Sequence, residues 1–150
     1  MKIRKFKKQD IDRCLDIECS EERSDNREIV KSNFLRELND DRSLVLVAEI
    51  NNEVAGFIDG RIDAWNNSFY IEQLFIDRGQ RGKGCGSKLI SEVIKTAKKL
   101  KLRIIFVDLP PQNKNAMRFY LKNGFQKAGK INELYNNPKR PNSVILSQKL

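Results

Sequence analysis

The sequence predicts an α/β fold with a mixed central sheet of about seven strands and about four helices. Three successive apolar segments, separated by asparagine-containing turns, lie within residues 44–76 and are typical of an antiparallel meander. A long amphipathic helical pattern follows. It leads to the continuous apolar run 104–107, as expected of a strand that is covered on both faces. Strand, helix and strand in this order predict a right-handed parallel crossover.

The N-terminal part predicts one strand and two helices. A short strand is expected at residues 3–6, and Asp10 is expected to cap a helix whose side chains at 11–18 recur at helical spacing. Polar residues 20–26 then interrupt the pattern. A second helical pattern occupies residues 29–38.

The central part predicts the meander and the longest helix. Its strands are expected at residues 44–50, 54–62 and 68–76. The helix is expected from about residue 84 to residue 101, since its apolar residues form one stripe and lysines occupy the opposite face.

The C-terminal part predicts a short helix and two strands. Asn113 or Asn115 can cap the helix, and Gly124 suits a left-handed residue at its end. The strands are expected near residues 125–134 and 143–150. Because we find no repeat or linker, we expect one domain over the whole chain.

The composition favours a soluble protein. The chain has 150 residues, of which 39% are hydrophobic and 33% charged, and it has neither a membrane-length apolar run nor a signal-peptide core at its N-terminus. We therefore expect a cytoplasmic protein with no membrane partner. The net charge of +9 comes from lysines spread along the chain, which favours a solvated basic surface over nucleic-acid binding.

Cysteine and histidine usage narrows the chemistry. Cys14, Cys19 and Cys85 are odd in number and lack a CxxC spacing, so they predict reduced thiols and no zinc site. The chain contains no histidine. Histidine-dependent nucleophiles, bases and metal ligands are thus excluded, and carboxylates, tyrosine, lysine or backbone groups must carry any catalysis.

The segment Arg81-Gly82-Lys83-Gly84-Cys85-Gly86 is the strongest functional signal. Its glycines let the backbone approach a ligand, and the first amides of the following helix have no intrahelical acceptor. These amides, the helix dipole and the basic side chains, with Arg78 and Lys88 close by, predict a phosphate site.

Two common phosphate motifs do not fit this segment. A P-loop needs lysine directly after its last glycine, where this chain has Cys85 after Gly84. The dinucleotide pattern G-x-G-x-x-G, started at Gly82, ends at Ser87 instead of glycine.

The pattern R-x-x-G-x-G, formed by Arg81, Gly84 and Gly86, resembles the acetyl-CoA-binding motif of the GCN5-related N-acetyltransferases. Residues 70–76 are similar to the fourth strand of that family, and residues 113–125 are similar to its N-x-x-A…Y…GF segment. The order of the other elements also agrees, so the resemblance covers nearly the whole chain.

The resemblance implies direct transfer of an acetyl group from acetyl-CoA to a primary amine in a ternary complex, without a metal. The pyrophosphate would lie on the loop amides, and the pantetheine arm would lie between the fourth and fifth strands. The residues implied in acetyl-CoA binding are Leu74, Phe75, Ile76, Arg81, Gly82, Lys83, Gly84, Cys85, Gly86, Ser87, Asn113 and Tyr120.

Three catalytic residues are implied. Tyr120 matches the family tyrosine that protonates the departing thiolate; its alternative is a packed aromatic. An amine with a pKa near ~10 is neutral in roughly one part in a thousand at pH 7, so its proton must be taken up. Glu72 is the first candidate to take this proton; its alternative role is that of an exposed carboxylate on a strand. Asp108 is the second candidate; its alternative role is that of a cap near Pro110.

The acceptor stays open at the level of sequence. Residues 70–76 also resemble polyamine acetyltransferases, and Glu21, Glu22, Asp25 and Glu28 could serve a small amine or polyamine or simply form a solvated loop. Acetylation of a protein N-terminus or lysine is the enzymatic alternative. The alternative from another class is an acyl-CoA-binding or nucleic-acid-binding module. Homodimer formation is also left open.

Overall fold

The computed structural model describes residues 1–20 and 26–150 and contains one seven-stranded sheet in the order β1-β2-β3-β4-β5-β7-β6. This confirms the predicted fold class. In chain order the elements are β1 (Lys2–Lys5), a 3-10 turn (Lys8–Asp10), α1 (Ile11–Cys19), α2 (Arg27–Glu37), β2 (Ser43–Ile50), β3 (Glu53–Asp63), β4 (Ser68–Ile76), a 3-10 turn (Arg78–Gln80), α3 (Cys85–Lys99), β5 (Ile104–Leu109), α4 (Lys114–Lys122), β6 (Gln126–Ile131) and β7 (Ser143–Lys149).

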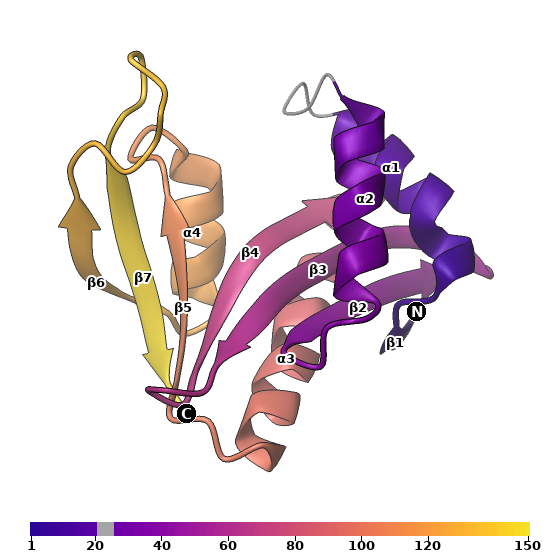
Figure 1. Cartoon of the computed structure of the whole chain (residues 1–150), viewed down its shortest axis with the longest axis horizontal. Helices are drawn as coiled ribbons and strands as arrows, with labels where there is room; N and C mark the ends of the chain where they lie inside the picture. The colour runs from indigo at the N-terminus through magenta and orange to yellow at the C-terminus, as the bar shows by residue number, and fades with distance from the viewer. Residues whose placement is uncertain (21–25) are drawn as a thin grey trace.

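The sheet is antiparallel except at its centre. Strands β1 to β4 form an antiparallel meander, β4 and β5 are parallel, and β7 pairs antiparallel with both β5 and β6. Helix α3 makes the crossover between the two parallel strands, as predicted. Helices α1 and α2 lie on one side of the meander and α3 lies on the other (Figure 1).

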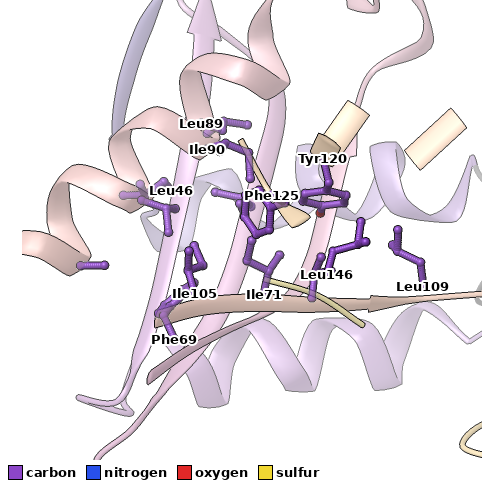
Figure 2. Packing of buried hydrophobic residues seen from close by; sticks show 14 of the residues in the cluster. Leu46, Phe69, Ile71, Leu89, Ile90, Ile105, Leu109, Tyr120, Phe125 and Leu146 are labelled. Atoms are coloured by element: carbon purple, nitrogen blue, oxygen red, sulfur yellow. The ribbon is translucent and has the colours of Figure 1, made fainter. Parts of the chain in front are cut away.

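Each face of the sheet has its own hydrophobic core. On the α3 and α4 side, Leu89 and Ile90 of α3 pack with Ile71 of β4 and Ile105 of β5 (Figure 2). On the α1 and α2 side, four phenylalanine rings form a continuous row with centroids 5.2 to 5.5 Å apart: Phe6, Phe34, Phe57 and Phe75. Burial on both faces fixes which side of each strand meets which helices.

The two central strands separate after a short paired stretch. Their register runs only from Ser68 opposite Ile104 to Tyr70 opposite Phe106, although β4 continues to Ile76. Pairing of β4 with β3 is also irregular here, because Asp59 lies opposite Gln73 and Gly60 opposite Ile71, so that the residue between them bulges out. A bulge bends its strand. Strands β4 and β5 accordingly diverge towards their C-terminal ends (Figure 1). We call this divergence of the two strands the split.

Asp10 occupies the predicted N-cap position of α1, but its side chain does not cap the helix. The Asp10 side chain makes no cap hydrogen bond with α1; it accepts from the Lys7 backbone N–H at 2.8 Å and pairs with Arg4 at 2.7 Å. The guanidinium of Arg4 is a stronger donor for a buried carboxylate than a helix amide. Of the two candidate caps for α4, the structure has Asn113, whose side chain accepts from Ala116 N–H at 3.1 Å.

Candidate active site

The phosphate loop lies between the end of β4 and the first turn of α3. Gly82 and Gly84 have φ angles of 76° and 83°, in the left-handed region that residues with a Cβ rarely adopt. Gly84 is the N-terminal cap residue of α3, which begins at Cys85 and runs for 15 residues. A Cβ added at either glycine would meet nothing within 4 Å, so the loop leaves open space beside the first amides of a long helix.

The third glycine of the loop has a packing role. A Cβ on Gly86 would stand 3.0 Å from the Phe119 ring of α4, so the glycine permits the close approach of α3 and α4. Cys85 is 1% exposed, and its thiol faces the carbonyl of Gln80 at 3.8 Å. The structure thus packs Cys85 inside, while Ser87 is half-buried on the first turn of α3.

Basic side chains surround the loop without covering it. Arg81 donates from Nε to the carbonyl of Ile76 at 3.2 Å, and Lys83 donates from Nζ to Gln80 Oε1 at 3.0 Å. Both residues are exposed, as are Arg78 and Lys88. Their charges add to the partial positive charge of the helix N-terminus, so this end of the split is electropositive.

Tyr120, on α4, belongs to the hydrophobic core on the α3 and α4 side of the sheet. It is 4% exposed and packs edge to face with Phe119 and Phe125, with centroid distances of 5.1 and 5.2 Å. Figure 2 shows it beside Phe125. Burial, with the charges of Asp59 and Tyr70, raises the pKa of Tyr120 above its ordinary value. The hydroxyl therefore carries its proton and is a donor.

Asp108 is held by two tyrosines. The hydroxyls of Tyr70, on β4, and Tyr135, in the connection between β6 and β7, both donate to its carboxylate. Tyr70 also stacks on Phe106 with a centroid distance of 5.0 Å. Asp108 therefore links three segments at the edge of the split, instead of forming a cap near Pro110.

Glu72 is the bulge residue of β4 and lies on the side of α1 and α2. Its carboxylate accepts a hydrogen bond from Arg61 at 2.9 Å, and its side chain is 33% exposed. Arg61 also lies over the Tyr70 ring, 5.3 Å from the centroid. Glu72 is thus an accessible carboxylate with one cationic partner.

The structure adds three carboxylates that the sequence analysis missed and places them around one cavity with Glu72. A cavity of about 80 Å³ between α1, α2, β3 and β4 is lined by four acidic residues, which we call the carboxylate pocket: Glu18, Glu37, Asp59 and Glu72. Of the acidic residues expected from the first helix connection, Glu21, Glu22 and Asp25 lie outside the described residues. Glu28 is exposed at the start of α2.

Burial and mutual repulsion alter the acidity of the pocket. Burial, together with Glu72 and Glu18, raises the pKa of Glu37 to about 7. The Asp59 pKa is raised well above its ordinary value, first by burial and then by its acidic neighbours. A cation in the pocket would oppose both effects.

The described residues contain neither a group of metal-ligating side chains nor a helix that could cross a membrane. Within residues 1–20 and 26–150, no group of three or more Cys, Asp or Glu side chains is placed to hold a metal ion. No helix in this part of the chain has the length and hydropathy to span a membrane.

The fold and the site together define a class of protein: an α/β chain in which a strand, a glycine loop and a helix N-terminus form an anion site beside a split between parallel strands. Residues 9–125 match the model of the acetyltransferase (GNAT) family. The chain belongs to this family, as the resemblance predicted.

Two curated relatives carry acetyltransferase names. An uncharacterized N-acetyltransferase of Methanocaldococcus jannaschii is 32% identical over 87 residues, which cover 54% of this chain and 38% of the relative. A probable spermine N(1)-acetyltransferase of Bacillus subtilis subsp. natto is 31% identical over 70 residues, 46% of each protein. The matches thus span about half or less of these relatives.

Solved structures share the fold. A ribosomal-protein-alanine N-acetyltransferase from Brucella melitensis aligns over 100% of both chains with a TM-score of 0.84 and 20% identity. A putative streptothricin acetyltransferase from Bacillus anthracis, solved with acetyl coenzyme A, aligns over 78% of this chain and 68% of its own with a TM-score of 0.70 and 26% identity.

Proposed function

We propose that the protein transfers the acetyl group of acetyl-CoA to a small primary amine, polyamines included, by direct attack in a ternary complex. The observation that carries this proposal is the split between β4 and β5, which has the phosphate loop at one end and the carboxylate pocket on one face. A polyanionic donor and a cationic acceptor would therefore meet from opposite sides.

The donor fits the residues present. Its pyrophosphate would lie on the amides from Arg81 to Ser87, where two left-handed glycines expose the first turn of α3. In the described chain, β4 beyond Tyr70 no longer pairs with β5, so the backbone of Leu74, Phe75 and Ile76 can hydrogen-bond to the pantetheine arm. Asn113, which caps α4 after the end of β5, would contact the arm from the other side.

The reaction exchanges one bond for another. The amine nitrogen forms a bond to the thioester carbonyl carbon, the carbon–sulfur bond breaks, and the sulfur leaves as a thiolate. Tyr120 gives this thiolate its proton; the raised pKa keeps the hydroxyl protonated before the reaction, while it also makes the phenol a weaker acid than a free tyrosine. The proton lost by the amine passes to a carboxylate on the acceptor side, and Glu72 is the accessible candidate nearest the split.

Asp108 serves in this proposal as an anchor. Because it accepts from two tyrosine hydroxyls, its oxygens are already engaged on both sides of the split. Asp108 would then fix the width of the acceptor cleft, while Glu72 attracts and orients the ammonium group.

The proposal is tested by a thiol-release screen with acetyl-CoA against polyamines, simple alkylamines, amino acids, aminoglycosides and peptides. We expect turnover with small aliphatic amines. Turnover with peptides alone would show that the acceptor is a protein N-terminus or lysine and not a small amine. Salt-dependent DNA affinity without turnover on any amine would overturn the proposal.

A further inference from the structure

We propose that the carboxylate pocket binds a second, non-reacting ammonium group of the acceptor, so that a diamine or polyamine is preferred to a monoamine of the same length. This inference rests on the proposed acetyl transfer, and it assigns specificity to three residues outside the family motifs: Glu18, Glu37 and Asp59.

Asp59 is the first reason. It interrupts an otherwise apolar stretch of β3 and is 3% exposed. It lies on the same face of β3 as Phe57, which packs against α1 and α2. Its Oδ1 atom is buried and has no hydrogen-bond partner among the described residues. A buried carboxylate oxygen without a donor is costly unless a ligand supplies one. Asp59 lines the cavity, so a ligand bound there can donate a hydrogen bond to this oxygen.

The other walls of the pocket repeat this pattern. Glu37 Oε2, from α2, is likewise buried without a partner among the described residues. Glu18, from α1, is 5% exposed and accepts from Gln73 Nε2 at 3.2 Å. An ammonium group has three donors and no acceptor, which matches a wall of carboxylate oxygens better than a neutral or anionic group does.

The size of the pocket selects a small cationic group. Its volume of about 80 Å³ exceeds the roughly 10 to 15 Å³ that one water needs, yet it cannot take a large ring. A second cavity of about 520 Å³ adjoins it and shares Arg36, Glu37 and Glu72. The rest of an extended acceptor can lie in this outer groove, where Asp40 and Asp63 add carboxylates that are paired with Arg42 at 3.2 Å and with Arg61 at 3.7 Å.

The position of the pocket suits a chain bound at both ends. Glu72 and Gln73 line the pocket and directly precede Leu74, the first of the three residues proposed to hold the pantetheine arm. An acceptor with one amine at the split can therefore place its other amine a few methylenes away in the pocket.

Binding of the second cation should release protons. With the pKa of Glu37 at about 7, this carboxyl is partly protonated at neutral pH, and a bound cation would drive its ionisation. The charged groups around the pocket are Glu18 from α1, Arg36 and Glu37 from α2, Asp59 and Arg61 from β3, and Glu72 from β4.

The test compares 1,4-diaminobutane with butylamine, which differ only in the second amine. We expect wild-type kcat/KM to be at least about tenfold higher for the diamine, as lost hydrogen bonds to charged groups cost that much. Asp59→Asn and Glu37→Gln should each lower kcat/KM at least about tenfold for the diamine and less than about threefold for butylamine. Glu53→Gln, an exposed charge on β3, is the matched control.

Direct binding separates this inference from the acetyl-transfer proposal. Calorimetry with coenzyme A present should show diamine binding that Asp59→Asn weakens about tenfold or more, with proton release that Glu37→Gln reduces. Equal kcat/KM and equal affinity for both amines would overturn the pocket assignment while leaving acetyl transfer intact. Diamine binding that depends on Asp59, without turnover on any amine, would instead overturn the acetyl transfer.

Discussion

At the scale of single residues, the chemistry depends on two kinds of group with raised pKa values: a tyrosine that stays protonated and carboxyls that are partly protonated at neutral pH. Tyr120 is buried among aromatic rings, and burial raises its pKa. Glu37 is raised to about 7 by burial and by Glu72 and Glu18. Both shifts have the same first cause, desolvation of the charged form.

Replacement of Tyr120 by Phe removes the proposed proton donor and keeps the ring. We expect kcat to fall by about 10²-fold or more, the usual contribution of a general acid. The dissociation constant of acetyl-CoA, measured by calorimetry, should change little because the hydroxyl acts on the departing thiolate. An unchanged kcat would remove the assignment of Tyr120.

Replacement of Glu37 by Gln tests the raised pKa through stability. A carboxyl whose folded pKa is raised binds its proton more tightly in the native state, so it lowers stability as the pH rises from about 4.5 to about 7. The wild type should lose Tm relative to Glu37→Gln over this interval and run parallel to it above pH 7. Glu28→Gln, exposed on the same helix, should show no such difference. A constant difference across the interval would contradict the shift.

At the scale of elements, the site depends on where regular structure is interrupted. The bulge at Glu72 and the end of pairing at Tyr70 open the split, and the left-handed glycines start α3 at its edge. Antiparallel pairs on the outer sides hold β4 and β5 in place while they diverge. The proposed anion site and acceptor cleft are therefore bordered by strands that are paired on their outer sides.

Replacement of Gly84 by Val tests the loop. A β-branched residue in the left-handed region costs about 1 to 2 kcal/mol. A Cβ at this position meets nothing within 4 Å, so the protein should still fold. We expect acetyl-CoA binding to be lost in calorimetry, since the side chain projects where the pyrophosphate is proposed to lie. Gly129→Val, in equally open space on β6, is the control that should bind normally.

At the scale of the whole molecule, the sequence predicts most of the fold because apolar periodicity is a local property. The meander, the crossover helix and the strand at Ile104–Leu109 all follow from short-range patterns. The structure was needed to choose between Asn113 and Asn115 as the cap, since both lie at the start of the same helical pattern.

The carboxylate pocket could not be predicted in this way. Its members lie at positions 18, 37, 59 and 72 on four different elements, and only the packing of α1 and α2 on β3 and β4 brings them together. A local signal was nevertheless present, because Asp59 occupies an inward position of an apolar strand and Glu18 lies on the apolar side of its helix. The contacts of Asp108 with Tyr70 and Tyr135 are likewise tertiary.

The most direct test of the central claim is a single-turnover experiment with the protein in excess over labelled acetyl-CoA and with 1,4-diaminobutane present. We expect label to pass from acetyl-CoA to the diamine, with one coenzyme A released per acetylated amine and no labelled protein at any time point by mass spectrometry. Label that first appears on the protein, or coenzyme A released without acetylated amine, would contradict direct transfer.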